Sequence, residues 1–207
     1  MERELVAVWV GERSRRAALQ RFAHEQIPSP SPSLCSGSGS GDGAMAPSLH
    51  KNYGRRMDIT WLTDRIAVGG GIWNSQNMET VAREGITHVI DMQIEFDDTP
   101  LGFEHGVKVL WNPTDDDFMP KPAELFRKGV DFATEALDKP GSKLFIHCAA
   151  GVHRAPMMTL ALLGSMGWDL EDAMRMIETR RPTADFADVY VESVERFLNH
   201  GQGRTQH

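Results

Sequence analysis

Residues 143–158 read KLFIHCAAGVHRAPMM, and this stretch of sequence decides the fold. Its first five residues, Lys143 to His147, form a short apolar run typical of a buried strand. From Ala155 to about Met166 the chain is apolar on nearly every face, as in a helix at the centre of a domain. The stretch therefore predicts a strand, a tight loop and a central helix in direct succession.

The loop between this strand and this helix has the composition of an anion-binding site. Five residues separate Cys148 from Arg154, so the loop can curl until its backbone N–H groups converge on one point. The following helix adds the positive end of its dipole there, and Arg154 can hold two phosphate oxygens at once. Gly151 supplies a bend, and the same positive field favours the thiolate form of Cys148. We expect a phosphate to contact Ala149, Ala150, Gly151, Val152, His153 and Arg154.

Strand and helix patterns alternate on both sides of this loop. The sequence predicts strands at 66–68, 87–92 and 107–111, and helices at about 75–84 and 122–137. Two amphipathic helices follow, one around 170–177 and one around 190–197. This order predicts an α/β fold with a mainly parallel central sheet and helices on both sides. In open sheets of that kind the site lies at the carboxyl ends of the strands, where Cys148 falls.

The composition and net charge of the chain indicate which kinds of binding partner and compartment to expect. The chain of 207 residues is 41% hydrophobic, which suits one core of ordinary size, and its formal charge is −7. An acidic balance disfavours nucleic acid and anionic membranes as partners. Cysteine occurs only at positions 35 and 148, so a disulfide framework is not expected and a reducing compartment is. We expect a cytoplasmic monomer.

The first part of the chain differs from the rest. Residues 28–43 read PSPSPSLCSGSGSGDG and offer almost nothing to bury, so they predict disorder. We expect residues 1–56 to form a disordered or low-complexity extension, residues 57–201 the folded domain, and residues 202–207 a tail.

The segment from His147 to Arg154 resembles the loop of the protein tyrosine and dual-specificity phosphatases, whose pattern is His-Cys-x-x-Gly-x-x-Arg-Ser/Thr. The resemblance covers roughly residues 59–200, including an Asp-rich turn before the long helix and the pair Arg181-Pro182. It implies a dual-specificity phosphatase-like fold. It also implies that Cys148 attacks phosphorus to give a phosphocysteine, and that the reaction uses no cofactor and no metal. His147 is expected to be a buried supporting residue that hydrogen-bonds backbone and orients the loop.

In the family, an aspartate about 30 residues before the cysteine protonates the leaving oxygen. Residues 111–120 read WNPTDDDFMP and offer Asp115, Asp116 and Asp117. Aligning the following helix without gaps favours Asp116, which lies 32 residues before Cys148. A proton donor is needed because an alkoxide or phenoxide leaves poorly.

One position departs from the family pattern. Ala155 stands where a serine or threonine hydroxyl usually helps the thiolate leave the phosphocysteine, so its presence predicts slower breakdown of that intermediate. The run Arg154-Ala155-Pro156 also resembles a variant found in plant glucan phosphatases. Three functions stay open: a protein phosphatase acting on phosphotyrosine, phosphoserine and phosphothreonine, a glucan phosphatase, and a phosphate-binding pseudophosphatase with poor turnover.

Overall fold

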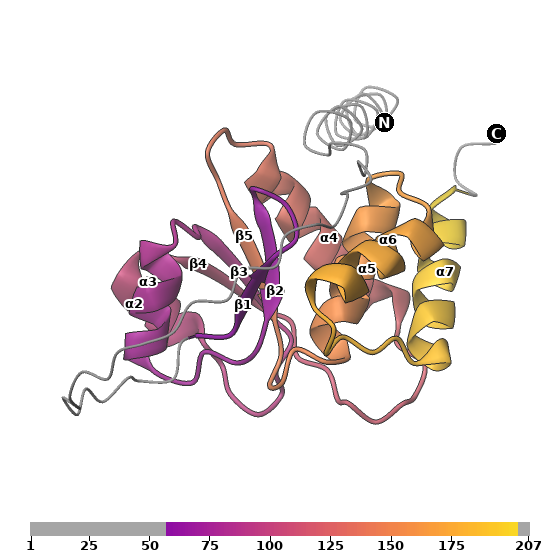
Figure 1. Ribbon diagram of the computed structural model, residues 1–207. Coiled ribbons are helices and arrows are strands. Elements are labelled where there is room, and N and C mark those ends of the chain that lie inside the picture. Colours follow the sequence, from indigo (N-terminus) through magenta and orange to yellow (C-terminus); the bar gives the residue numbers. More distant parts are fainter. Residues whose placement is uncertain (1–56, 203–207) are drawn as a thin grey trace, which may run out of the picture.

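The structure is a computed structural model that describes residues 57–202, with side chains as far as residue 199. The expected N-terminal extension, residues 1–56, and nearly all of the expected tail lie outside the described residues. Within the described part, five strands form one sheet and six helices pack around it (Figure 1). None of these helices has the length and apolar character needed to cross a membrane.

The sheet has the strand order β1-β2-β5-β3-β4. Only β1 is antiparallel to its neighbour, and the other pairs are parallel. The strand that leads to Cys148 is therefore central, with β2 on one side and β3 on the other. The bounds are β1 Ile59–Trp61, β2 Ile66–Gly69, β3 His88–Asp91, β4 Lys108–Trp111 and β5 Leu144–His147.

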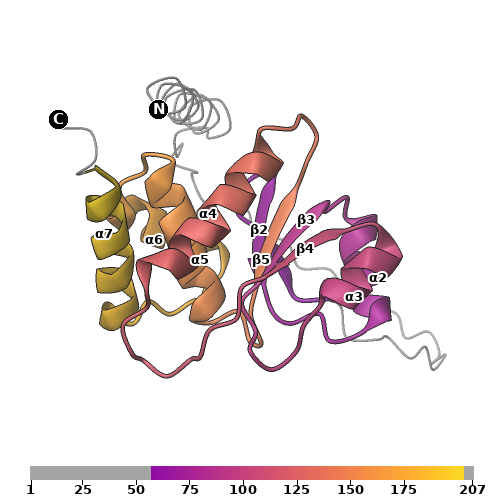
Figure 2. The same cartoon turned by 180° about the vertical axis from the view of Figure 1, so that it is seen from behind.

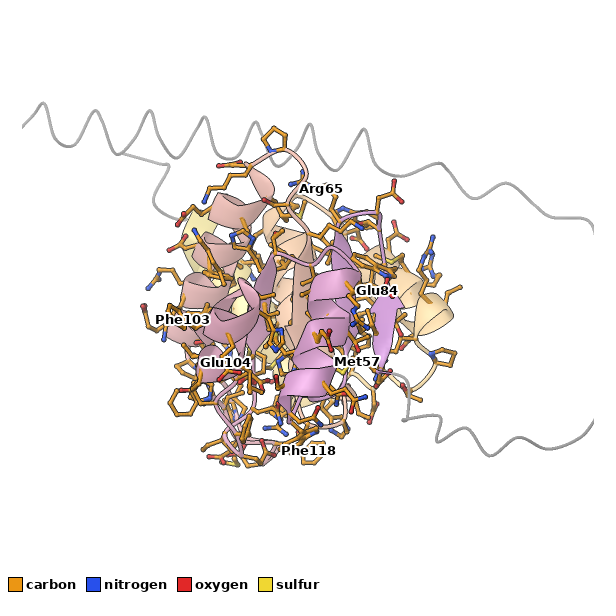
Figure 3. The ribbon with its side chains drawn as sticks, turned by 90° about the vertical axis from the view of Figure 1, so that its left-hand side faces the viewer. Met57, Arg65, Glu84, Phe103, Glu104 and Phe118 are labelled. Carbon is orange, nitrogen blue, oxygen red and sulfur yellow. The ribbon has the colours of Figure 1, made fainter. Side chains whose placement is uncertain are left out.

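The register brings the ends of the parallel strands to one level. His147, the last residue of β5, pairs with Gly69 of β2 and with Asp91 of β3, and Asp91 in turn pairs with Trp111 of β4. The loops after all four strands consequently leave from the same edge of the sheet. Figure 3 shows this edge near Phe118, at the opposite end of the molecule from Arg65, which precedes β2.

Helices cover both faces of the sheet, as predicted. Helices α2 and α3 lie on one face, and α4 to α7 lie on the other (Figures 1 and 2). Helix α5 contacts α4, α6 and α7 and is the centre of the larger layer. The bounds are α2 Ser75–Arg83, α3 Thr99–His105, α4 Ala123–Leu137, α5 Arg154–Ser165, α6 Leu170–Arg180 and α7 Asp188–Gln202.

Two hydrophobic cores, one on each face, follow from the alternation of side chains along the strands. Ile66 and Val68 of β2 point into the larger core under α4 to α7, whereas Ala67 between them belongs to the smaller core under α2 and α3. In β5, Ile146 and Phe145 divide between the two cores in the same way. Because both faces are covered, these strands are apolar throughout rather than alternating in polarity.

Local signals in the sequence set the helix ends. Asn74 caps α2 by accepting a hydrogen bond from the backbone N–H of Asn77 at 2.9 Å. Asp169 caps α6 in the same way through the N–H groups of Glu171 and Asp172. Helix α3 ends at Gly106, whose φ of 70° is a conformation that glycine adopts without strain.

Sequence reasoning missed β1 and α3. Strand β1 has three half-buried residues and lies at the sheet edge, so it carries no continuous apolar run. Helix α3 has seven residues, among them Pro100 and Gly102, both poor helix formers in isolation. Gly102 is required because a Cβ there would lie 2.3 Å from the Val109 side chain of β4. Packing against β4, rather than propensity, stabilises this helix.

Candidate active site

Cys148 lies in the loop between the central strand β5 and helix α5 and is 1% exposed. Its backbone N–H donates to the carbonyl of Gly69, at the end of β2. The N–H of Gly151 points back at the sulfur, with 3.2 Å between nitrogen and Sγ. This N–H is placed to donate a hydrogen bond to the sulfur.

Gly151 is at the turn of this loop because no larger residue fits. Its φ is +65°, in the region that residues with a side chain rarely adopt. A Cβ would also lie 2.5 Å from the carbonyl oxygen of Gly69 and 2.4 Å from the guanidinium of Arg181. The sequence-based expectation of a bend at Gly151 agrees with this geometry.

Arg181, at the end of α6, supports the loop from behind. Its Nε donates to the carbonyl oxygen of Gly151 at 2.7 Å, and a terminal nitrogen donates to that of Ala150 at 3.1 Å. Asp58, just before β1, accepts two further hydrogen bonds from the same guanidinium. The hydrogen bond from Arg181 lowers the pKa of Asp58 below its usual value. Arg181 therefore joins the loop of Cys148 to the segment that precedes β1.

Arg154 is the first residue of α5, and its side chain is almost fully buried. Its two terminal nitrogens donate to the two carboxylate oxygens of Glu95 at 2.9 and 2.8 Å. A third bond reaches the carbonyl of Thr114 at 3.2 Å. Burial would lower the pKa of Arg154, but the hydrogen bond to Glu95 raises it, so the guanidinium stays charged.

The Nε of Arg154 differs from its terminal nitrogens because it is buried and has no hydrogen-bond partner. It lies 3.8 Å from Oδ2 of Asp116, which is within ion-pair distance but too far for a hydrogen bond. A buried N–H without a partner is costly, and such groups are usually explained by a ligand or a catalytic role. This N–H is therefore available to an anion held by the loop.

Sequence reasoning missed Glu95. It lies in the loop after β3, and its pKa is lowered by the hydrogen bond from Arg154. The loop reads DMQIEFDD over residues 91–98 and has no glycine or apolar periodicity to single out one acid among four. Only the alignment of strand ends brings it to Arg154.

Asp116 is the member of the acidic turn that lies at the site. His153 Nδ1 is 3.1 Å from its Oδ2, and the hydroxyl of Tyr190 donates to its Oδ1 at 3.1 Å. Asp117 instead pairs with Lys121, and Asp115 is exposed beside the half-buried Thr114. The choice of Asp116 over its neighbours is thus compatible with the geometry.

His153 joins two segments at the end of the loop. Its Nε2 lies 3.2 Å from Oδ2 of Asp185, in the segment between α6 and α7, while its Nδ1 faces Asp116. The edge of the Phe118 ring packs against the imidazole, with 5.1 Å between ring centroids. Its partners show that His153 holds the acidic turn against the loop of Cys148.

His147 is fully buried, as expected, but its ring does not hydrogen-bond the backbone. Its Nε2 lies 3.1 Å from Oδ2 of Asp98 and 3.7 Å from Oδ1 of Asp91. Desolvation raises the pKa of Asp91 to about 6, partly offset by His147. These three side chains are close enough to share a proton or to hold a metal ion, and they are the one such group within residues 57–199. All three side chains are enclosed, directly behind the residue that begins the loop.

A buried cysteine and a buried arginine on one strand–loop–helix, with a carboxylate held above them, define a cysteine-dependent phosphatase. A family model described as "Dual specificity phosphatase, catalytic domain" matches residues 71–197. The chain belongs to this family.

Several curated proteins are similar in sequence. Protein phosphatase Slingshot homolog 3 of Mus musculus is 29% identical over 115 residues, which are 55% of this chain and 17% of that protein. Protein tyrosine phosphatase type IVA 3 of Homo sapiens is 30% identical over 50% of this chain and 60% of its own length. Dual specificity protein phosphatase 26 of Rattus norvegicus is 33% identical over 43% of each chain. The matches thus span less than two thirds of each relative.

Solved structures share the fold at lower identity. The structure of PTPMT1 in complex with PI(5)P superposes with a TM-score of 0.64 and 21% identity, covering 72% of this chain and 99% of that one. Human DUSP28 gives a TM-score of 0.59 and 19% identity, covering 70% of this chain and 95% of its own. At these identities the likeness shows the fold alone.

Proposed function

We propose that this phosphatase hydrolyses phosphate monoesters through a phosphocysteine, with Cys148 as nucleophile, Arg154 as phosphate ligand and Asp116 as general acid. The free Nε–H of Arg154 carries the proposal. It is buried, it belongs to a charged guanidinium and has no hydrogen-bond partner, and it follows the same loop as the sulfur of Cys148. A phosphoryl group bound by the loop amides would supply the missing acceptor.

The first step transfers the phosphoryl group to sulfur. The thiolate of Cys148 forms an S–P bond as the bond between phosphorus and the ester oxygen breaks. Asp116, carrying a proton, gives it to that oxygen, so a neutral alcohol or phenol leaves. Arg154 and the loop amides balance the charge on the phosphoryl oxygens.

The second step returns the enzyme to its starting state. Asp116, now ionised, takes a proton from water, and the water oxygen attacks phosphorus. The S–P bond breaks, inorganic phosphate leaves, and Cys148 is again a thiolate. His153 and Tyr190 hold the Asp116 carboxylate in place for both steps.

For substrate we propose phosphorylated protein, with phosphotyrosine and phosphoserine or phosphothreonine both accepted, because the relatives named above are protein phosphatases. No observation favours a glucan, so the Arg-Ala-Pro resemblance has no structural counterpart. The pseudophosphatase alternative rests on Ala155 alone.

The test is hydrolysis of p-nitrophenyl phosphate by the full chain and three variants. Cys148→Ser should abolish turnover while still binding phosphate, and Arg154→Lys should bind phosphate weakly because lysine has no Nε–H fork. Asp116→Asn should reduce kcat by about 100-fold or more. Asp115→Asn is the matched control and should leave kcat unchanged. Hydrolysis retained by Cys148→Ser would refute the mechanism, and binding without turnover in the wild type would establish the pseudophosphatase.

A further inference from the structure

Exposed apolar side chains gather at the mouth of the phosphate site. Among the described residues seven large hydrophobic side chains are exposed, and only Phe103 lies away from the strand ends, on α3. The other six are at the carboxyl end of β4 or in the segments that follow β2, β3 and β4. We call these six the apolar rim: Trp73, Ile94, Phe96, Trp111, Phe118 and Met119.

Two rim aromatics lie on either side of the central strand. Trp73 follows β2 and Phe96 follows β3, the two strands that flank β5, and their ring centroids are 6.1 Å apart. The loop of Trp73 is held to the phosphate loop by the N–H of Gly71, which donates to the carbonyl of Ala149 at 3.1 Å. Phe96 is next to Glu95, the partner of Arg154. This aromatic pair therefore lies beside the phosphate position.

Phe118 lies at the other end of the phosphate loop. Its ring stacks on Tyr190 at 5.8 Å and packs edge-on against His153, leaving about half of the side chain exposed at the end of the molecule seen in Figure 3. Its backbone N–H donates to the Tyr190 hydroxyl at 3.0 Å. The phosphate loop is thus bordered by aromatic rings at both ends.

Backbone strain coincides with this rim. Within the described residues, the non-glycine residues with positive φ are Trp73, at 63°, and Phe118, at 55°. Bulky residues in this region are rare and persist only where the surrounding structure holds them, most often at functional sites. Both strained residues present an exposed aromatic ring at the mouth, which indicates a binding role.

The charge of the mouth is acidic. Segments 70–74, 92–98, 112–122 and 182–187 together carry seven acidic residues and one lysine. That lysine, Lys121, is buried and paired with Asp117, and Arg154 is paired with Glu95. Asp97 and Asp115 are left without a cationic partner within the described residues. Arg154 would hold one phosphate group. Any further negative charge on a substrate would be repelled by the surrounding acidic residues.

We infer that the apolar rim and its acidic neighbours select a phosphorylated peptide segment whose residues beside the phosphoresidue are apolar and basic. This inference rests on the proposed function and deepens it. Apolar side chains of the peptide bury the rim aromatics, and arginine or lysine side chains lie over those rings and beside Asp97 and Asp115. A peptide fits better than a lipid surface, because an anionic headgroup layer would be repelled by the acidic segments.

The experiment compares four substrates with the full chain. Two are phosphotyrosyl peptides of equal length, one with arginine and leucine on both sides of the phosphotyrosine and one with glutamate replacing each arginine. The third is PI(5)P in phosphatidylcholine vesicles, and the fourth is p-nitrophenyl phosphate. We expect kcat/KM for the basic peptide to exceed that for the acidic peptide by about tenfold at low salt, and less at high salt.

Variants assign the preference to the rim. The double variant Asp97→Asn with Asp115→Asn should lower the ratio of kcat/KM between basic and acidic peptides toward one. Asparagine at 97 keeps the side-chain oxygen that accepts from the N–H of Thr99. Phe96→Ser should lower kcat/KM for both peptides relative to p-nitrophenyl phosphate. Glu104→Gln and Phe103→Ser, exposed positions on α3 away from the mouth in Figure 3, are the matched controls and should change neither ratio.

The outcomes separate this inference from the proposed function. No hydrolysis of p-nitrophenyl phosphate would refute the proposed function itself. Hydrolysis of that ester with equal or greater kcat/KM for the acidic peptide would overturn the inference and leave the function standing. Faster hydrolysis of PI(5)P in vesicles than of either peptide would also overturn it.

Discussion

Glu95 accepts hydrogen bonds from both terminal nitrogens of the Arg154 guanidinium, so the orientation of this guanidinium is set by a residue on a different loop. The pair leaves Nε–H as the free face of the guanidinium. The guanidinium is a rigid planar group with five N–H donors. Because a neighbouring carboxylate holds its two terminal nitrogens, the direction of the Nε–H is fixed as well, which is preorganisation by an ion pair.

Replacing Glu95 with glutamine should lower kcat/KM for p-nitrophenyl phosphate by about tenfold to 100-fold, because Arg154 loses its fixed orientation. The pKa of Glu95 is lowered by Arg154, so the wild-type pair is present at neutral and mildly acidic pH and is lost only as pH falls through that lowered value. The variant's deficit should therefore be constant from about pH 5.5 to 8 in steady-state kinetics. Glu124→Gln, which breaks an exposed pair with Arg127 on α4, is the control; a similar loss there would contradict the assignment.

Removing the Tyr190 hydroxyl should weaken the general acid without touching the nucleophile. That hydroxyl donates to Asp116 and accepts from the N–H of Phe118, so Tyr190→Phe removes both of these hydrogen bonds between the acidic turn and α7. We expect kcat to fall about tenfold with phenyl phosphate, whose leaving group needs a proton. With p-nitrophenyl phosphate, whose phenol is more acidic and leaves more readily without a proton, the loss should be smaller.

Ser193→Ala is the matched control for this prediction. Ser193 is one turn further along α7 and accepts from the N–H of Lys121, at the far end of the same turn, but does not contact Asp116. It should lower stability to a similar degree, and its effect should not depend on the leaving group. Equal dependence on the leaving group in both variants would mean that Tyr190 acts only through the fold.

The buried carboxyl of Asp91 should make stability depend on pH in an unusual direction. Desolvation raises its pKa to about 6 from 3.8, so between these values the folded state binds more protons than the unfolded state. The free energy of unfolding should then fall by about 2 kcal/mol as pH rises from about 4 to 6. Urea denaturation of wild type and Asp91→Asn across this range should show a flatter profile in the variant. Glu104→Gln, an exposed carboxylate, should keep the wild-type slope, and an unchanged slope in Asp91→Asn would contradict the prediction.

Replacing Ala155 with serine should speed breakdown of the phosphocysteine if that step limits turnover. Ala155 is fully buried at the first turn of α5, next to Arg154. A hydroxyl there can donate to sulfur as the thiolate leaves, so kcat should rise about tenfold while kcat/KM, which reports formation of the intermediate, stays constant. Rapid-quench measurement of the initial burst provides the check: a smaller burst in the variant supports the idea, and a proportional rise in kcat/KM would count against it.

The central part of the fold could be predicted because apolar runs mark its strands and helices and turn residues mark where they end. Strand β5 and helix α5 came within one residue of the expected bounds, since a continuous apolar run bordered by Gly141 and Gly151 leaves little choice of register. The family and the cysteine-dependent phosphatase chemistry were also predicted correctly from the loop.

Contacts made across the sheet edge could not be predicted. Glu95, Tyr190 and Asp58 reach the site from segments 53, 42 and 90 residues away from Cys148, and nothing local marks them. The same limit explains His147, whose partners proved to be Asp91 and Asp98 rather than backbone. The roles of Cys148, Arg154 and Asp116, the domain bounds, the monomeric state and the cytoplasmic location stay predictions.

Arg181 hydrogen-bonds Asp58, which lies 123 positions earlier in the sequence. It also hydrogen-bonds Gly151, in the loop of Cys148. During synthesis the ribosome must therefore release α6 before the loop of Cys148 can take its final shape. The family match begins at residue 71, beyond β1 and Asp58. A fragment trimmed to that boundary would keep the nucleophile, the guanidinium of Arg154 and the acidic turn, yet lose the anchor of Arg181. Expression designs for this chain should start no later than Met57.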